Sequence, residues 1–376
     1  MIHFGYTFYS LGLFFQIRVA HFCAISLRKM NEHKELTDHG DRAVMKAILQ
    51  NEFGGPEVLK YQDTDIPQVK DGEVLIQVHA IGMNPPDWYL REGYKNLPPE
   101  WQPKVPFPII LGTDISGTIT AVHQSVKDFK IGDEVYSMVR FPSYGDSRAY
   151  AEYVSVPAVE IAIKPTKISH IEAAAAPMSL LTAWQFLISV GHQVQNPLQP
   201  LMHEPVPLKG KKVLINGAAG GVGHFALQLA KWQGAHVISV ASGKHERLLR
   251  QLGTDEFIDY TKILPEDVVK DVDLVIDAVG GVKSARFLSV IKPGGALFPI
   301  FPLGFSSRDE ANQLGVTVSA TQVRSSGSQL AELAALLNDG TIKVAIDSTF
   351  SLADAALAHR RAEQGHIQGK IVLTVR

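Results

Sequence analysis

The stretch Lys212-Val-Leu-Ile-Asn-Gly217-Ala-Ala-Gly-Gly-Val-Gly223 decides the fold of this chain of 376 residues. A short apolar run ends in a cluster of glycines, here called the glycine loop (residues 217–223), and a helix-favouring segment follows. Such an order lets bare backbone approach a diphosphate while the first N–H groups of a helix face the anion. Ala218 stands where the usual dinucleotide fingerprint has its first glycine, so the flanking strand and helix carry the prediction. The alternative is a glycine-rich turn that binds no ligand.

Strand-like and helix-like runs alternate around the glycine loop, at intervals of about 20 to 25 residues. This alternation predicts an α/β fold with a doubly wound parallel sheet, a Rossmann domain that extends over residues 169–341. The expected strands are Val213–Ile215, His236–Ala241, Phe257–Tyr260, Leu274–Val279 and Ala296–Ile300, and the expected helices are Phe225–Trp232, Glu246–Leu252 and Ala285–Val290.

The chain before the Rossmann domain follows a different pattern. Short β-type runs at Val74–Ile81, Gly117–Val122 and Tyr150–Val156 are separated by Gly, Pro and Asp clusters. We therefore predict a compact, mostly β domain over residues 45–168. A helix-favouring stretch from Glu172 to Val190 and a polar loop connect it to the Rossmann domain. The tail, residues 342–376, ends in the strand-like Lys370–Val375 and is predicted to rejoin the β domain.

Composition excludes several classes of protein. The 36 Lys and Arg against 38 Asp and Glu give a net charge of -2, so the chain has no excess positive charge for a nucleic acid partner. A hydrophobic fraction of 45% is typical of a globular chain. The single cysteine, Cys23, excludes an internal disulfide and any multi-cysteine metal site. A reducing compartment fits this count, and we predict a cytoplasmic protein.

Residues 1–44 differ from the rest and are predicted to be an extension without packed structure. Residues 1–28 are rich in aromatic residues and contain no Asp or Glu. Arg18 and His21 interrupt the apolar run before it reaches the ~20 residues that cross a bilayer, which argues against a membrane span. A transit peptide remains the alternative.

The type of cofactor follows from the end of the second strand of the Rossmann domain. An Asp or Glu there would bind the ribose hydroxyls of NAD, but the sequence continues as Val240-Ala-Ser-Gly-Lys-His-Glu-Arg247. Ser242 and Lys244, with Arg247, offer donors to a 2′-phosphate. A charge-assisted contact is worth roughly 1.5 to 3 kcal/mol, or about a tenfold to hundredfold preference. We predict NADP(H) over NAD(H); the alternative is that Lys244 is an ordinary solvated lysine.

Several motifs, in the same order along the chain, resemble the zinc-independent branch of the medium-chain dehydrogenase/reductase superfamily, the quinone oxidoreductase (zeta-crystallin-like) group. The resemblance implies a GroES-like β domain, a Rossmann domain and an active site in the cleft between them. The matching segments are 45–49, 53–59, 84–88, 108–117, 129–136, 173–184, the glycine loop, 277–281 and 369–373.

Metal-dependent alcohol dehydrogenases of the same superfamily carry a cysteine where this chain has Asn84-Pro-Pro, and a His-Glu pair where it has Thr113-Asp114. They also have a four-cysteine lobe, which is absent here. The residues that remain do not supply a four-ligand N/S site for zinc, so we predict no metal. The chemistry left for the cleft is hydride transfer from NADPH to a quinone, or to the C=C bond of an enone or enal.

The resemblance also implies site residues. Asn84 matches a position near the nicotinamide, and Tyr89 and Tyr94 lie in the segment that supplies a tyrosine to the cleft, so these three are the candidate catalytic residues. A phenol of ordinary pKa about 10 can donate a proton at neutral pH. Packing alone is the alternative role for both tyrosines, and Asp87 is expected to fix its loop. The expected cofactor-binding residues are Thr182, Ala218, Gly220, Gly221, Val222, Gly223, Ser242, Lys244, Tyr260, Val279 and Gly280.

The sequence excludes two other classes of nucleotide-binding enzyme. No tyrosine has a lysine four positions on, which excludes a short-chain reductase, and no Gly-Lys-Ser/Thr closes a phosphate loop. A non-catalytic NADPH-binding protein of the same fold, with a redox-sensing or structural role, stays open. The expected partners are a small-molecule electron acceptor and a second copy of the chain, paired through the sixth strand near Val316–Val323, with neither nucleic acid nor membrane.

Overall fold

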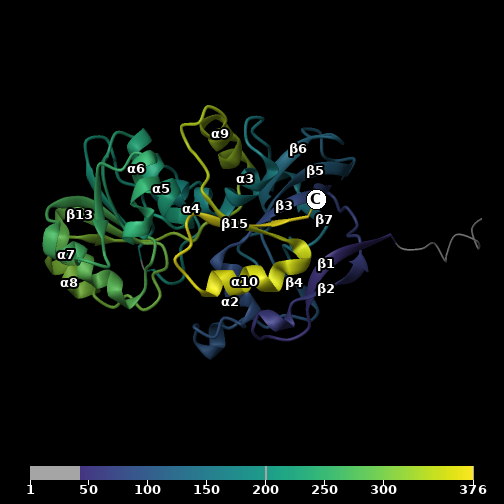
Figure 1. Ribbon diagram of the computed structural model, residues 1–376, viewed down its shortest axis with the longest axis horizontal. Helices are drawn as coiled ribbons and strands as arrows, with labels where there is room; N and C mark the ends of the chain where they lie inside the picture. Colours follow the sequence, from purple (N-terminus) through teal and green to yellow (C-terminus); the bar gives the residue numbers. More distant parts are fainter. Residues whose placement is uncertain (1–42, 200, 376) are drawn as a thin grey trace, which may run out of the picture. The chain divides into compact units, whose positions relative to one another are not determined.

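The computed structural model describes residues 43–199 and 201–375. The predicted extension, with its alternative of a transit peptide, lies outside the described residues except for its last two positions. From Met45 onward the chain forms one compact unit of mixed α/β structure. It contains a parallel sheet, drawn in green tones in Figure 1, and a mainly antiparallel sheet, drawn in blue and yellow.

The parallel sheet has six strands in the order β11-β10-β9-β12-β13-β14, and its neighbours pair in parallel. This is the predicted doubly wound arrangement, since the first strand, β9, lies at the centre. The order reverses between β9 and β12, where Asn216 pairs with Asp277 at the carboxyl ends. Ligands bind at this kind of reversal point. The strands are β9 (Lys212–Asn216), β10 (His236–Ala241), β11 (Glu256–Asp259), β12 (Val272–Asp277), β13 (Ile291–Pro299) and β14 (Thr317–Val318).

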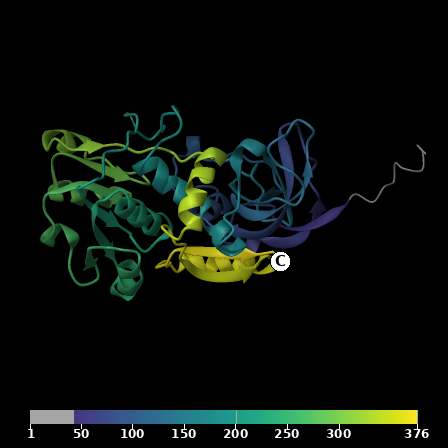
Figure 2. The same cartoon turned by 90° about the horizontal axis from the view of Figure 1, so that it is seen from above.

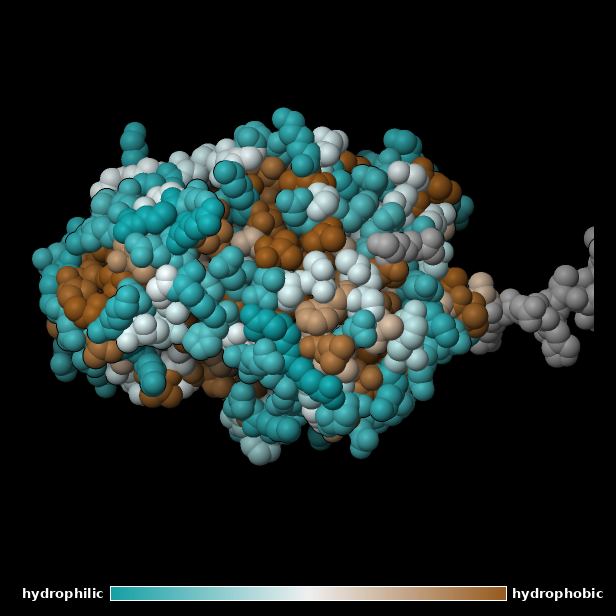
Figure 3. Space-filling view, viewed as in Figure 1, coloured by the Kyte–Doolittle hydropathy of each residue, from teal (hydrophilic) through white to brown (hydrophobic). Residues whose placement is uncertain are grey.

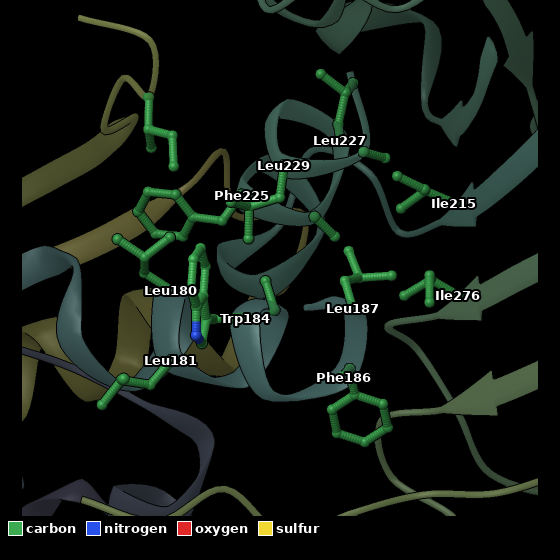
Figure 4. Packing of buried hydrophobic residues seen from close by; sticks show 14 of the residues in the cluster. Leu180, Leu181, Trp184, Phe186, Leu187, Ile215, Phe225, Leu227, Leu229 and Ile276 are labelled. Atoms are coloured by element: carbon green, nitrogen blue, oxygen red, sulfur yellow. The ribbon is translucent and has the colours of Figure 1, made fainter. Parts of the chain in front are cut away.

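Two helices, α4 (Pro177–Leu187) and α5 (Gly221–Trp232), pack against each other and against this sheet. Trp184 of α4 and Phe225 of α5 belong to one buried apolar cluster with Ile215 of β9 and Ile276 of β12 (Figure 4). Burying such side chains stabilises the fold by roughly 1.5 to 3 kcal/mol each. The same packing fixes α5, and with it the glycine loop, over the ends of the central strands.

The second sheet joins residues from both ends of the described chain. Its order is β15-β16-β3-β5-β6-β8, with β7 paired to β3, so the tail rejoins the β-rich part of the chain, as Figures 1 and 2 show in yellow. A small sheet, β2-β1-β4, adjoins it in sequence. The strands are β1 (Val44–Gln50), β2 (Lys60–Asp65), β3 (Glu73–Gly82), β4 (Ile109–Ile110), β5 (Asp114–Val122), β6 (Glu134–Met138), β7 (Tyr153–Pro157), β8 (Ile161–Ile163), β15 (Ile346–Ser351) and β16 (Lys370–Thr374).

Three expected elements differ from the structure. The helix expected over Glu172–Val190 is divided into α3 (His170–Ala175) and α4, because Pro177 has no N–H to continue the first helix. The helix expected at Ala285–Val290 is the 3₁₀ helix η5 (Val282–Val290). The strand expected near Val316–Val323 is reduced to the two residues of β14.

Further helices and short turns complete the described part of the chain. They are α2 (Pro85–Arg91), α6 (Glu246–Gln251), α7 (Pro265–Val268), α8 (Arg308–Gln313), α9 (Gly327–Asn338) and α10 (Ala355–Glu363), with short 3₁₀ turns η1 (Pro56–Val58), η2 (Pro99–Trp101), η3 (Ala158–Glu160), η4 (Gly243–His245) and η6 (Leu352–Asp354).

The surface carries apolar side chains in separate patches among hydrophilic ones on the face drawn in Figure 3. None of the helices in the described part of the chain combines the length and the apolar character that crossing a bilayer requires.

Candidate active site

A cavity of about 570 Å³ opens at the carboxyl ends of β9 and β12, where the strand order reverses. Its wall combines the glycine loop with residues from the other sheet. Met83, Pro85 and Trp88 come from the end of β3 and the start of α2, and Lys370 and Ile371 come from β16. The cavity therefore lies where the predicted nucleotide-binding region meets the β-rich region.

The glycine loop brings backbone without bulky side chains to the cavity wall. Gly217 has φ +73°, a left-handed conformation that favours glycine. A Cβ on Gly223 would overlap the carbonyl oxygen of Gly217, so helix and turn are in direct backbone contact there. At Gly220, the N-cap of α5, a Cβ would meet only that same oxygen, at 3.4 Å, and would occupy the open cavity. The first turn of α5 thus offers N–H groups with no partner inside the helix.

Asp277 organises the turn that follows β12. Its Oδ1 accepts hydrogen bonds from the side chain of Asn216 at 2.8 Å and from the backbone N–H groups of Val279 and Gly280, and its Oδ2 accepts one from Ser284. These bonds lock the ends of the two central strands together. Val279 lines the cavity and is 65% exposed, so it can contact a bound group; Gly280 is half-buried and does not line the cavity.

One end of the cavity carries the residues expected to distinguish the two nicotinamide cofactors. Ser242, at the end of β10, and Tyr260, just after β11, both line it. Tyr260 is 39% exposed, and its hydroxyl lies 3.4 Å from Nδ1 of His366. Lys244 is exposed but does not line the cavity.

The other end holds a buried polar cluster around Asn84. Lys370 donates from Nζ to Oδ1 of Asn84, whose Nδ2 lies 3.5 Å from Oγ1 of Thr113. Thr113 donates to Oδ1 of Asp114 at 3.4 Å, and the backbone N–H of Met178 donates to Oδ2 of the same carboxyl group at 2.9 Å. Asn84 is buried and does not line the cavity, whereas Lys370 does. Of the positions that the resemblance compared with metal ligands, Asn84 accepts a hydrogen bond from Lys370, and the charge of Asp114 raises the pKa of that lysine.

Asp87 connects this cluster to a buried chain of hydrogen bonds. Its Oδ2 accepts from the backbone N–H of Asn84 at 2.9 Å, which closes a capping box, and from the hydroxyl of Tyr150 at 3.1 Å. Arg91 has donors only, so Nδ1 of His359 accepts from it at 3.0 Å, and Nε2 then carries the proton and donates to Tyr150. Asp87 therefore fixes the start of α2, as expected.

Burial sets the protonation of these groups. It raises the pKa of Asp87 to about 7, against the opposing bond from Asn84, and the charge of Asp114 adds to the rise. Burial likewise raises the pKa of Asp114 to about 6, which the charge of Lys370 opposes. It lowers the pKa of His359 to about 3, and Arg91 lowers it further, so the ring is neutral at physiological pH. Burial also lowers the pKa of Lys370, while Asp114 and Asp87 raise it.

The two candidate tyrosines lie in a separate small recess beside the cavity. Tyr89 and Tyr94 line it together with Phe301, and their ring centroids are 6.0 Å apart. Tyr89 is also 6.1 Å from Phe301, which belongs to the loop after β13. Burial raises the pKa of both phenols above the ordinary value, so both are protonated at neutral pH. Either could donate a proton, and both also pack on aromatic neighbours.

The structure brings part of the predicted set to the cavity wall. The predicted residues that line it are Gly220, Gly221, Val222, Gly223, Ser242, Tyr260 and Val279. Thr182 and Ala218 are buried behind the wall, and the hydroxyl of Thr182 donates to the carbonyl oxygen of Met178 at 2.7 Å. Sequence reasoning missed the lining residues Ser179, Lys283, Arg286 and Lys370. For Lys370 a signal existed, since it lies in the segment 369–373 that carries the resemblance.

Comparisons with known proteins agree with this geometry. Residues 70–166 match the alcohol dehydrogenase GroES-like domain, and residues 252–373 match the zinc-binding dehydrogenase family. Among the described residues, no group of three or more His, Cys, Asp and Glu side chains is placed to hold a metal ion.

Individual relatives extend over nearly the whole chain. "NAD(P)H oxidoreductase RTN4IP1, mitochondrial" of Danio rerio is 33% identical and covers 89% of this chain and 92% of its own length. "NADPH-dependent alkenal/one oxidoreductase, chloroplastic" of Arabidopsis thaliana is 31% identical and covers 88% of this chain and 79% of its own length. The solved quinone oxidoreductase from Coxiella burnetii is 32% identical, with a TM-score of 0.75, and covers 89% of this chain and all of its own.

Proposed function

Because this chain belongs to the zinc-independent quinone oxidoreductase group of the medium-chain dehydrogenase/reductase superfamily, we propose that it is an NADPH-dependent oxidoreductase that reduces a quinone, or the C=C bond of an enone or enal. The observation that carries the proposal is the cavity itself. It joins a glycine loop at the reversal point of a parallel sheet to polar groups of a second sheet.

The residues of the glycine loop fit a dinucleotide. A side chain at Gly220 would extend into the cavity in front of the first turn of α5, where the diphosphate is proposed to rest, and a side chain at Gly221 would meet Ser179 and Lys370 of the cavity wall. Bound NADPH supplies a hydride from its nicotinamide ring. The protein then has to place the acceptor, exclude water and stabilise the negative charge that develops on it.

We propose NADPH rather than NADH as the cofactor on two grounds. The end of β10 carries Ser242 and Lys244 and no acidic residue, and one of the relatives is named as NADPH-dependent. Lys244→Ala is expected to raise the Michaelis constant for NADPH about tenfold and to leave that for NADH unchanged. If Lys244→Ala changes the Michaelis constants for NADPH and NADH equally, Lys244 is an ordinary solvated lysine. Lys262→Ala, at another exposed lysine, is the control.

The test of the whole proposal is an NADPH-oxidation screen of the purified protein against quinones, enals and enones. We expect turnover with at least one class, unaffected by a strong chelator, and no stoichiometric metal in the purified protein. Tight NADPH binding without oxidation by any acceptor would favour the non-catalytic alternative. A tightly held zinc with chelator-sensitive turnover would contradict the metal-free proposal.

Two further parts of the proposal concern assembly and compartment. We propose a homodimer in which β14, one of the two edge strands of the parallel sheet, lies against its copy, and the mass of the protein in solution tests it. The proposed compartment is the cytoplasm, on the basis of the single cysteine, although relatives carry mitochondrial and chloroplastic names. Uptake of the full-length chain by isolated mitochondria, with cleavage near its start, would contradict it.

A further inference from the structure

Lys370 is a buried lysine whose position is fixed by backbone contacts on both sides. The N–H of Gly369 donates to the carbonyl oxygen of Ala219 at 2.8 Å, and the N–H of Lys370 donates to that of Ala345 at 2.9 Å. Gly369 has φ +77°, and a Cβ there would overlap the carbonyl oxygen of Ala345. The C-terminal strand is therefore held directly against the glycine loop.

The side chain of Lys370 extends from the glycine loop to the Asn84 cluster. Its Cδ would lie 3.2 Å from a Cβ on Gly221, and its Nζ donates to Oδ1 of Asn84. The backbone on the far side is fixed as well, since the N–H of Met83 donates to the carbonyl oxygen of Ile371 at 3.0 Å. The ammonium group thus lies at the point where the two sheets meet.

The charge of this group is supported by two carboxyl groups. Asp114 and Asp87 both favour the protonated lysine, and they come from different elements, β5 and α2. His224 of α5 is the other titratable group that interacts with it, and burial keeps that ring neutral at neutral pH. A lysine that is 3% exposed therefore has counter-charges from the protein and lies against the cavity.

An ammonium group has three N–H donors. In the described part of the chain, Oδ1 of Asn84 is the only hydrogen-bond acceptor that Nζ of Lys370 contacts. Two donors remain for a ligand in a side chain that forms part of the cavity wall. Asn84 itself is behind that wall, so its part is to orient Lys370.

We propose that Lys370 is a catalytic residue that donates a hydrogen bond to the carbonyl oxygen of the acceptor and stabilises the negative charge that develops on it. This inference rests on the proposed function. Hydride, with its electron pair, adds to the conjugated carbon; the C=C or C=O electron pair moves so that the charge reaches the oxygen. The cofactor is oxidised and the acceptor reduced, no bond to Lys370 breaks, and a proton, which the phenol of Tyr89 can supply and regain from solvent, completes the product.

A phenol tests this role without any turnover. With saturating NADP⁺, 4-nitrophenol represents an acceptor whose oxygen has become anionic, and its absorbance reports the ionised fraction. We expect the wild-type site to bind the phenolate about 10 to 100 times more tightly than the phenol, the strength of a charge-assisted hydrogen bond. An unchanged or raised pKa of the bound phenol in the wild type would overturn the proposal.

Variants assign the effect to the side chain. Lys370→Met is expected to abolish the preference for phenolate and to lower kcat about 10 to 100 times, with the affinity for NADPH changed less than twofold. Lys343→Met, an exposed lysine outside the cavity wall, is the matched control. Loss of Lys370 leaves two buried carboxyl groups without their counter-charge. If Lys370→Met unfolds, the double variant Lys370→Met with Asp87→Asn is measured in its place.

Two other outcomes have distinct meanings. If Lys370→Met weakens NADPH binding tenfold or more and leaves the pKa of bound 4-nitrophenol unchanged, Lys370 binds the diphosphate and the proposal is wrong. If the wild-type protein binds no NADPH, the proposed function fails, and the role inferred here fails with it. If NADPH is bound and oxidised but the bound phenol is unperturbed, only the role of Lys370 is refuted.

Discussion

Substitution of Gly220 by alanine separates the binding role of the glycine loop from its structural role. Gly220 has φ −78° and ψ −177°, which any residue adopts, and the added methyl group would meet only the carbonyl oxygen of Gly217, at 3.4 Å. Alanine is a poorer N-cap than glycine, so we expect a loss of unfolding free energy of no more than about 1 kcal/mol.

The effect on NADPH binding is expected to be larger. The methyl group would occupy the cavity in front of the first turn of α5, where the diphosphate is proposed to rest. Loss of one charge-assisted hydrogen bond costs about 1.5 to 3 kcal/mol, so the dissociation constant for NADPH should rise about 10 to 100 times. The measurements are urea unfolding and titration of NADPH fluorescence on the same preparations.

Gly223→Ala is the matched comparison in the same loop. Its methyl group would overlap backbone atoms of Gly217 and Ala218, which cannot move away as a flexible side chain could. We expect a loss of about 3 kcal/mol of unfolding free energy, the upper end of the cost of overpacking. The reasoning is refuted if Gly220→Ala binds NADPH within twofold of the wild type, or if it is destabilised as much as Gly223→Ala.

Three further predictions address the surroundings of the cavity. The pKa of Asp87 is about 7 in the folded chain against the ordinary 3.8, so the folded state holds a proton that the unfolded state loses as the pH rises from about 4 to 7. The unfolding free energy of the wild type minus that of Asp87→Asn, measured with urea, should therefore fall over this range by up to about 1.4 kcal/mol per pH unit. A difference that rises with pH would contradict the raised pKa of Asp87. Gly369→Ala should lose at least about 2 kcal/mol more unfolding free energy than Gly365→Ala. Both glycines have positive φ, but only a Cβ at position 369 would overlap a backbone atom, the carbonyl oxygen of Ala345. Equal losses would show that this contact relaxes. Tyr89→Phe removes a candidate proton donor and should lower kcat for enone reduction about a hundredfold. Tyr144→Phe, at an exposed tyrosine, is the control, and an unchanged kcat in Tyr89→Phe would show that Tyr89 only packs.

Local sequence patterns were sufficient for the sheet and the loop. The β9 run, the glycine loop and α5 are contiguous, and their conformations follow from residue type: glycine where φ is positive or backbone atoms meet, and apolar residues where α5 faces the sheet. Residue type also accounts for the break between α3 and α4, because Pro177 has no N–H to continue the first helix. Lys244, in contrast, was chosen from its place in the sequence, and the fold leaves it outside the cavity wall.

By itself, the sequence determined the parallel sheet, the glycine loop and the return of the tail to the β-rich region, because each depends on the periodicity and residue types of one continuous segment. Only the tertiary structure decided which polar groups meet at the cavity. Asn84, Asp114 and Lys370 come from three strand or helix ends far apart in the chain, and pairing of β16 with β3 and of β3 with β5 brings them together. The shifted pKa values of the two carboxyl groups and the lysine arise from that shared burial, which no local pattern encodes.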